Sequence, residues 1–198
     1  MNRAITISRE YGSGGREIGE KLARRLGIPF YDKELIAMIA KEGNIETSVL
    51  EANDEVDPDF DNYSPRQVPP DYQIAMTQRI YAAQATVIRN LNDKGPCVIV
   101  GRCADYVLRE NKNCLHVYVY ANHFTRMDRI IKQYGVDPAK AADTLVKQDK
   151  QRANYYNFYS NKKWADMNNY DLVVNSSLFG IDGSVDVIKA ALENAEKK

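Results

Sequence analysis

Residues 4–15 read AITISREYGSGG, a short run of β-forming residues that leads into a glycine cluster. Apolar and β-branched residues are enriched in strands, so positions 4–8 predict a strand. Beyond the glycines, Ile18, Leu22 and Leu26 recur every four positions, and Gly27 follows where helices commonly end. The segment therefore predicts a strand, a glycine-rich turn and a helix in succession.

This arrangement is typical of an anion site, because backbone N–H groups converge at the turn and the helix dipole adds positive charge. A dinucleotide-binding fold would place G-x-G-x-x-G directly after the strand, with an acid about twenty residues on. Gly12, Gly14 and Asp32 fit that pattern in part, but Glu17 stands at the third glycine. Residues 8–11 supply the lead-in of a phosphate-wrapping P-loop, which we favour. A purely structural glycine turn is the third interpretation.

As a P-loop, the segment is degenerate. Aligned with G-x-x-x-x-G-K-[ST], Arg9 replaces the first glycine, Gly14 is the second, and Gly15 replaces the lysine. Arg16 and Glu17 follow where small and hydroxyl residues would stand. The lysine normally neutralises the β- and γ-phosphates, and the hydroxyl holds Mg²⁺. Arg16 is the candidate replacement for the charge, since a guanidinium forks well onto phosphate.

Further apolar runs extend the pattern along the chain. Strands are predicted over 28–31, 97–100, 115–121 and 172–174. Helical segments separate them, including a long helix over 71–92 after an irregular, proline-containing linker over 53–70. Asp32 is placed to cap the helix that follows the second strand. The alternation predicts an α/β fold with a parallel sheet, five strands and seven or eight helices.

Composition excludes several classes of protein. The 198 residues contain 27% charged and 44% hydrophobic residues, with 27 Lys plus Arg against 27 Asp plus Glu, so we expect no nucleic-acid partner. Eight acidic residues and no Lys or Arg lie between Glu42 and Ser64, which is typical of a solvated surface segment. The rest of the chain therefore has a net positive charge, which suits a compact anionic ligand.

The rarer residues point to a cytoplasmic protein. Three cysteines without metal-ligand spacing favour reduced thiols, and the short apolar start favours neither a secretion signal nor a membrane span. Two histidines leave little for a histidine-rich zinc site or a Ser-His-Asp triad. We therefore expect no membrane partner and no metal-ligating residue set.

The segment 137–164 is polar, helical and rich in Lys, Arg and Tyr. This pattern is typical of a mobile flap over a ligand, and equally of an ordinary exposed helix. Its Asp149 and Arg152 lie three apart, as an i,i+3 ion pair would. The tyrosines of 155–159 favour packing, although a ring could stack on a base.

Several motifs, in this order, resemble the cytidylate kinases, which are P-loop nucleoside monophosphate kinases. They are the opening 7–15, Gly101-Arg102 at a strand end, the Arg126/Arg129 pair, the Asp149/Arg152 pair with Tyr155-Tyr156, and the final strand 170–175. The likeness is closest to the divergent cytidylate-kinase-like branch. It covers nearly the whole chain and is weakest over 43–93.

The resemblance implies a three-layer P-loop kinase fold with a parallel five-stranded core, an inserted helical acceptor lobe and a mobile helical lid. One domain over 1–198 would comprise a core (1–42, 94–136 and 165–198), an acceptor-nucleotide lobe (43–93) and a lid (137–164). It also implies ATP and Mg²⁺ as cofactors and a small-molecule nucleotide, most closely CMP or a related pyrimidine nucleotide, as the partner.

The resemblance also implies residue roles. The ATP phosphates would lie on the loop formed by Gly12, Ser13, Gly14, Gly15, Arg16 and Glu17. The acceptor would be bound by Asp32, Arg102 and Asp149, of which Asp149 would alternatively hold Arg152. The transferring phosphoryl group would be neutralised by Arg16, Arg126, Arg129 and Arg152. Surface charge is the plainer interpretation of Arg126 and Arg129.

The chain also departs from the family pattern. The acid that precedes Gly-Arg in those enzymes is Val100 here, the one that follows is Cys103, and Asp105 is displaced by two residues. The carboxylate route to Mg²⁺ is therefore missing. A catalytically weak or inactive nucleotide-binding protein with the kinase fold is the alternative interpretation.

Overall fold

Strand β1 (Ala4–Arg9) forms the centre of the sheet in this computed structural model, which describes residues 3–52, 55 and 70–195. The strand order is β2-β3-β1-β4-β5 and every pairing is parallel. The other strands are β2 (Phe30–Tyr31), β3 (Val98–Val100), β4 (Cys114–Tyr120) and β5 (Leu172–Asn175). The predicted parallel five-stranded α/β core is thus confirmed, with a shorter second strand than 28–31.

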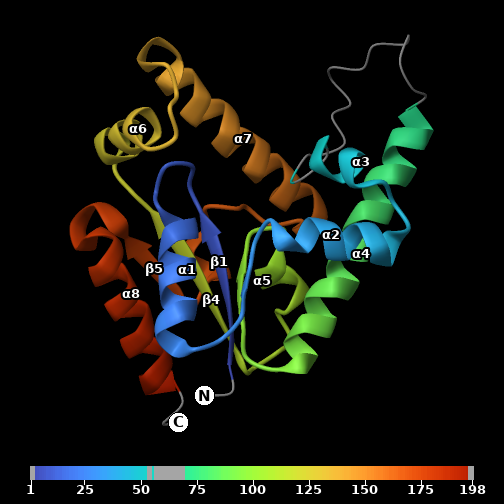
Figure 1. Cartoon of the computed structure of the whole chain (residues 1–198), viewed down its shortest axis with the longest axis horizontal. Coiled ribbons are helices and arrows are strands. Elements are labelled where there is room, and N and C mark those ends of the chain that lie inside the picture. The colour runs from blue at the N-terminus through green and yellow to red at the C-terminus, as the bar shows by residue number, and fades with distance from the viewer. Residues whose placement is uncertain (1–2, 53–54, 56–69, 196–198) are drawn as a thin grey trace.

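Helices cover both faces of the sheet (Figure 1). One face carries α1 (Gly15–Leu26) and α8 (Ser176–Ala195), which pack on each other over the apolar side chains of β1, β3 and β4. The opposite face carries α2 (Glu34–Gly43), α4 (Pro70–Lys94) and α5 (Ala104–Val107). The remaining helices are α3 (Thr47–Ala52), α6 (His123–Lys132) and α7 (Ala141–Ser160), with 3₁₀ turns η1 (Pro138–Lys140) and η2 (Met167–Asn169).

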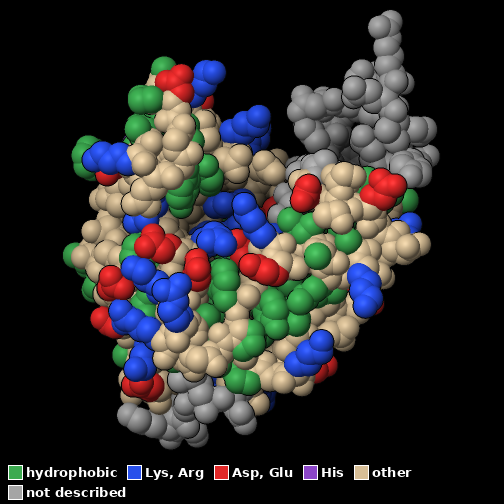
Figure 2. All heavy atoms as spheres, viewed as in Figure 1, with side chains coloured by type: hydrophobic (Ala, Val, Ile, Leu, Met, Phe, Trp, Pro, Cys, Tyr) green, Lys and Arg blue, Asp and Glu red, His purple; other side chains and the backbone are tan. Residues whose placement is uncertain are grey.

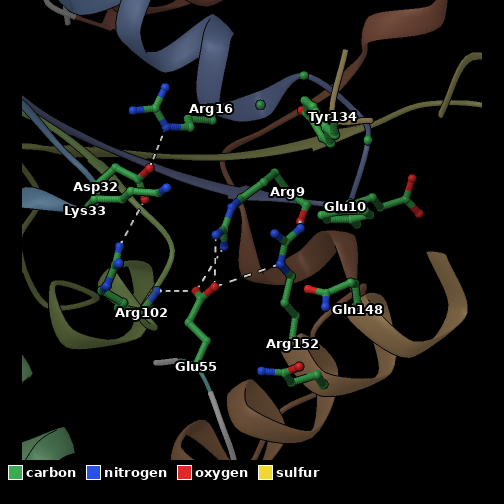
Figure 3. Close-up of a pocket in the computed structure, with 15 residues that line it drawn as sticks. Arg9, Glu10, Arg16, Asp32, Lys33, Glu55, Arg102, Tyr134, Gln148 and Arg152 are labelled. Carbon is green, nitrogen blue, oxygen red and sulfur yellow. Dashed lines mark hydrogen bonds and ion pairs between the residues drawn. The ribbon is translucent and has the colours of Figure 1, made fainter. Parts of the chain in front are cut away.

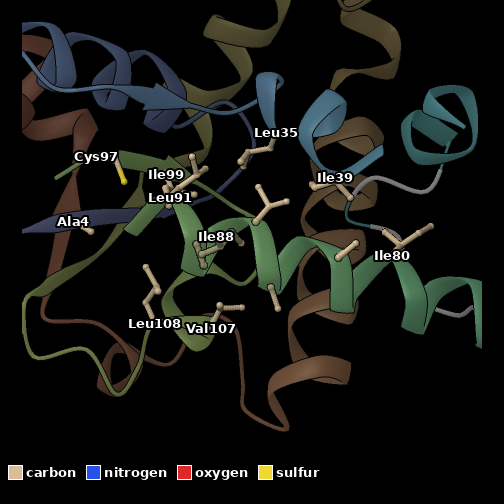
Figure 4. Packing of buried hydrophobic residues seen from close by; sticks show 14 of the residues in the cluster. Ala4, Leu35, Ile39, Ile80, Ile88, Leu91, Cys97, Ile99, Val107 and Leu108 are labelled. Atoms are coloured by element: carbon tan, nitrogen blue, oxygen red, sulfur yellow. The ribbon is translucent and has the colours of Figure 1, made fainter. Parts of the chain in front are cut away.

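The long helix α4 supplies much of the second core. Its Ile80, Ile88 and Leu91 are buried in a cluster that also contains Leu35 and Ile39 of α2 (Figure 4). The helix matches the predicted span 71–92 closely. The predicted linker over 53–70 lies outside the described residues, apart from Glu55 and the first residue of α4. None of the helices that the structure describes is long and apolar enough to cross a membrane.

The polar segment 137–164 is helical, as its sequence predicts, and is anchored near both ends of α7. Leu145 packs on Ile130 of α6, while Tyr155 and Tyr156 are buried beside the sheet. Tyr159 stacks on Tyr81 of α4 with ring centroids 4.0 Å apart, so the packing interpretation of the tyrosines is confirmed. Between its anchors α7 passes over the carboxyl edge of the sheet (Figure 1). Its mobility as a lid stays a prediction.

Asp105 turns into this tyrosine cluster and is 6% exposed. Its Oδ2 accepts a hydrogen bond from the Tyr156 hydroxyl at 2.7 Å. Burial raises the pKa of the Asp105 carboxyl from its ordinary 3.8 to about 6, because charge is costly there, although the Tyr156 hydroxyl opposes the rise. This carboxyl is therefore a structural group, and it ionises at a cost to the fold.

We expect Asp105→Asn to stabilise the protein at pH 8. Between about pH 4 and 6 the folded state holds a proton that the unfolded chain releases, so the free energy of unfolding falls as pH rises through that window. The difference corresponds to about 3 kcal/mol, at about 1.4 kcal/mol per pKa unit. Urea unfolding at pH 4.5 and 8 measures it, with the exposed Asp128→Asn as control. A gain that is the same at both pH values would contradict the prediction.

Candidate functional site

The glycine loop joins β1 to α1 at the carboxyl edge of the sheet. Gly12 and Gly14 have φ of +78° and +80°, left-handed values that glycine adopts without strain. Within the described part of the chain, the backbone N–H groups of Gly12, Gly14, Gly15 and Arg16 donate to no other protein group. Such free amides at a helix N-terminus form a site for an oxyanion.

A cavity of about 390 Å³ opens beside this loop (Figure 3). Figure 2 shows basic side chains gathered around the hollow. Its lining residues come from six separate segments of the chain. They are Arg9, Glu10, Tyr11, Gly12, Gly14, Gly15 and Arg16 of the β1–α1 region, Asp32 and Lys33 after β2, Glu55 and Arg102, and Tyr134, Gln148, Gln151 and Arg152 near or on α7.

Asp32 lies between two arginines at one side of the cavity. Its Oδ2 accepts from Arg16 Nε at 2.7 Å, and its Oδ1 accepts from Arg102 Nη1 at 3.2 Å. The predicted helix cap is therefore wrong: Lys33 is the residue that precedes α2, and among the described residues no side chain caps that helix end. Two positive neighbours hold the Asp32 carboxylate more strongly than a helix N-terminus would.

Arg102 is 2% exposed yet borders the cavity, at the end of β3. It and Cys103 both have left-handed φ values, +54° and +53°. Non-glycine residues pay for this conformation, and such strain concentrates at ligand sites. The turn directs the Arg102 side chain inward beneath the cavity, where it also donates to the Val100 carbonyl at 3.2 Å.

Glu55 lies at the centre of a second cluster, seen in Figure 3. Its carboxylate accepts from both Arg9 Nη1 and Nη2 at 2.9 Å and from the Arg102 backbone N–H at 2.7 Å, and Arg152 Nε lies 3.9 Å away. Burial by itself would raise the pKa of the Glu55 carboxyl, but the Arg9 charge outweighs it and holds that pKa well below 4.5.

The cluster carries more positive than negative charge. Burial, and then the nearby Arg9 charge, lower the pKa of the Arg152 guanidinium to about 10, although Glu55 and Asp149 oppose this. Arg152 also donates to the Arg9 carbonyl at 3.1 Å. Both arginines stay protonated at neutral pH, so an additional anion would relieve their mutual repulsion.

Arg126 and Asp149 form a brace beside the cavity. Arg126 donates to Asp149 Oδ2 and, at 2.7 Å, to the Tyr11 carbonyl, while the Tyr11 N–H donates to Asp149 Oδ1 at 2.8 Å. Arg126 also pairs with Glu10 at 3.2 Å. The expected pairing of Asp149 with Arg152 is corrected: Asp149 holds Arg126, because one helical turn along α7 puts Arg152 against Arg9 and Glu55 instead.

The remaining predicted residues also lie outside the cavity lining. Arg129 donates to Glu17 at 3.0 Å, and its Nε is buried without a partner among the described residues. The Ser13 hydroxyl donates to the Glu10 carbonyl at 2.8 Å and so stabilises the loop. The structure thus brings together at the cavity Gly12, Gly14, Gly15, Arg16, Asp32, Arg102 and Arg152. The lining does not include Ser13, Glu17, Arg126, Arg129 or Asp149. Their roles stay predictions.

Sequence reasoning missed Arg9 and Glu55 as cavity residues. In the sequence Arg9 was noted only because it replaces the first glycine of the P-loop pattern. A cation next to a loop without its lysine could have indicated that Arg9 faces the ligand. Glu55 lies in the acidic segment after Glu42, where nothing in the pattern distinguishes it from its neighbours.

The residues of the cavity fit the phosphates of ATP better than a dedicated metal site. Among the described residues no group of three or more His, Cys, Asp or Glu side chains could hold a metal ion. Both Asp32 oxygens and both Glu55 oxygens are engaged by arginines. These carboxylates therefore do not form a preformed set of Mg²⁺ ligands. Mg²⁺ commonly binds through substrate phosphates with few protein ligands.

Comparison with known proteins gives consistent matches along the chain. The model of the cytidylate kinase-like family matches residues 4–178. A cytidylate kinase of Archaeoglobus fulgidus is 25% identical over 96% of this chain and 94% of its own, and one of Methanoregula boonei is 27% identical over 98% and 96%.

The fold is also found in solved structures, of which we describe two. An uncharacterized protein from Eubacterium ventriosum is 30% identical, with a TM-score of 0.75 over 96% of this chain and 98% of its own. Shikimate kinase from Bacteroides thetaiotaomicron has a TM-score of 0.59 over 98% and 99%, and its 15% identity shows the fold alone.

Proposed function

The chain belongs to the cytidylate kinase-like family, and from that premise we propose that it transfers the γ-phosphoryl group of ATP to a nucleoside monophosphate, with CMP as the favoured acceptor. The products are ADP and a nucleoside diphosphate. The observation that carries the proposal is the row of free amides at Gly12, Gly14, Gly15 and Arg16, which faces a cavity rich in arginine.

Phosphoryl transfer needs positioning and charge neutralisation more than covalent chemistry from the protein. In the proposed arrangement the loop amides hold the ATP phosphates, and Arg152 neutralises charge where the phosphoryl group moves. MgATP is the form of ATP expected, with its ion carried on the phosphates. Arg16 reaches the same space from the first turn of α1, where its side chain is 48% exposed.

We assign the acceptor side of the cavity to Asp32 and Arg102. Both lie at strand ends, where open α/β sheets bind their ligands. Arg126, Arg129 and Asp149 act as positioning residues, since they tie the loop, α6 and α7 to one another. In this proposal 43–93 forms the acceptor lobe and 137–164 the lid, which excludes water so that the acceptor and not water is phosphorylated.

CMP is favoured because the curated relatives of Archaeoglobus fulgidus and Methanoregula boonei are named cytidylate kinases. A second candidate is a nucleotide-binding protein without turnover. One specific observation favours it: the Glu55 carboxylate occupies the arginine cluster where a substrate phosphate would bind.

A coupled assay of ADP formation separates the two candidates. We expect CMP to raise ADP release by about tenfold or more over the rate without acceptor, because a closed site protects ATP from water. UMP, AMP, GMP and shikimate complete the panel, and calorimetry measures ATP binding in parallel. Binding of ATP without turnover on any acceptor would favour the second candidate and reject the first.

A further inference from the structure

The Arg9 side chain fills the space that a side chain at position 15 would need. A Cβ built on Gly15 would lie 2.5 Å from the Arg9 Cβ and 3.1 Å from its Cγ, far inside normal contact distance. Gly15 is the first residue of α1, a position whose backbone accepts other residues. The stem of Arg9 is therefore what excludes a side chain there, including the lysine that P-loops carry at this position.

The other end of Arg9 reaches into the cavity. Its guanidinium lies beside Asp32, Arg102 and Arg152 in Figure 3, and its side chain is 12% exposed. Both of its terminal nitrogens hold the two oxygens of Glu55 at 2.9 Å. A fork-to-fork contact of this kind is how arginine binds carboxylate and phosphate alike.

We propose that Arg9 supplies the phosphate-binding cation that the missing P-loop lysine would otherwise supply, and that Gly15 is required because the Arg9 stem passes through the space of that lysine. The inference rests on the proposed function, since it takes the ligand to be the polyphosphate of a nucleoside triphosphate. In this proposal the Glu55 carboxylate and the phosphate compete for the Arg9 guanidinium.

The charge around Arg9 agrees with this role. Arg9 and Arg152 repel each other across the cluster, and the Glu55 carboxylate compensates only part of that charge. Arg16, the replacement suggested by the sequence, is committed to Asp32 at 2.7 Å and to Glu20 at 3.2 Å instead. Arg9 is paired as well, with Glu55, but it lies in a cluster with Arg152 where positive charge exceeds negative charge. We therefore assign the phosphate-binding charge to Arg9.

Calorimetry with ATP and with inorganic tripolyphosphate tests the proposal directly. Arg9→Met keeps much of the stem beside Gly15 and removes the charge, and we expect both affinities to fall about 10- to 100-fold, as for loss of hydrogen bonds to a charged group. Arg9→Lys should retain most of the binding. Arg24→Met, on an exposed arginine of α1, is the matched control and should bind as the wild type does.

A position swap gives the sharper result. Gly15→Lys alone should lose binding because the new side chain meets Arg9, and Arg9→Gly alone should lose it because the cation is gone. The double variant Arg9→Gly/Gly15→Lys restores the first glycine and the lysine of the usual P-loop pattern, with Arg16 still at the hydroxyl position. We expect it to bind tripolyphosphate about tenfold or more tighter than either single variant, the effect of one hydrogen bond to a charged group. Thermal unfolding checks that each variant is folded.

Glu55→Gln separates a ligand role from a structural one. If Arg9 binds phosphate, Glu55→Gln removes a competing carboxylate, and the variant should bind tripolyphosphate at least as tightly as the wild type. If Glu55→Gln weakens binding as much as Arg9→Met does, Arg9 acts only through its ion pair and the inference is overturned. Equal affinity of the wild type and Arg9→Met would also overturn it.

The outcomes also separate this inference from the proposed function. A wild type that binds ATP through Arg9 but phosphorylates no acceptor supports the inference and rejects the kinase. Turnover that survives intact in Arg9→Met rejects the inference and keeps the kinase. A wild type that binds neither ATP nor tripolyphosphate rejects both.

Discussion

Arg102→Met is expected to lower kcat/KM for the acceptor about 10²- to 10³-fold, the effect of removing one preorganised charged donor from a transfer site. The affinity for ATP should change little, because Arg102 lies across the cavity from the glycine loop. The variant should also unfold more easily. Arg102 is 2% exposed and pairs with Asp32, and removal of one partner of a buried pair costs about 3–5 kcal/mol.

Burial makes Arg102 important for folding as well as for the acceptor. A cation at a strand end would ordinarily be replaced with little cost to folding, but this one is enclosed and holds Asp32 as well as the Val100 carbonyl. Loss of activity in Arg102→Met could therefore follow from loss of structure.

The double variant Arg102→Met/Asp32→Asn resolves the ambiguity. It leaves no uncompensated carboxylate, so thermal unfolding should return toward that of the wild type while acceptor turnover stays lost. Asp32 is itself assigned to the acceptor side, so Asp32→Asn alone, with Arg102 in place, supplies the baseline for that comparison. Acceptor turnover in the double variant should fall well below that of Asp32→Asn. If activity returned together with stability in the double variant, Arg102 would be a structural residue and the acceptor assignment would fail.

The sheet could be predicted because its signals are local. Each strand is a short apolar run, and helical segments separate the runs, so their order indicated parallel pairing without any knowledge of contacts. The buried residues Ile18 and Leu22 of α1 fall on the predicted face.

The partners of the charged side chains could not be predicted in the same way. Asp32 had a good local explanation as a helix cap, yet two arginines from distant segments hold it. Asp149 likewise had a neighbour at helical spacing, Arg152, but binds Arg126 on another helix. Sequence spacing predicts on which face of a helix a residue lies. It does not predict with which of several oppositely charged residues the side chain pairs, because that depends on how the helices and strands pack.

The glycine loop shows both situations within a few residues. Its place at the end of β1 follows from the sequence alone. The contact between the Arg9 side chain and the space beside Gly15 could not be predicted, because it depends on how the backbones of these two residues lie relative to each other. The P-loop pattern is broken at two positions, by Arg9 in place of a glycine and by Gly15 in place of the lysine. The structure shows that these two changes belong together, which the sequence alone does not.

Gly14→Val is expected to have the largest effect on nucleotide binding. Gly14 has φ of +80°, a value that a β-branched residue adopts only under strain. A Cβ at this position would lie 2.5 Å from Ile181 Cδ1 and 3.1 Å from Arg129 Cζ. The loop must therefore shift, and its amides would no longer converge on one oxyanion. We expect ATP affinity to fall by about 100-fold or more, as expected when several hydrogen bonds to a charged ligand are lost together.

Gly27→Val is the matched control, because it separates backbone strain from damage to the loop. Gly27 ends the same helix, has φ of +66°, and has no atom within 4 Å of an added Cβ among the described residues. Both variants should lose stability through their left-handed backbone, but only Gly14→Val should lose ATP binding by calorimetry. If the two variants bound ATP equally well, the amides of the glycine loop could not be the phosphate site, and the kinase assignment would lose the observation that carries it.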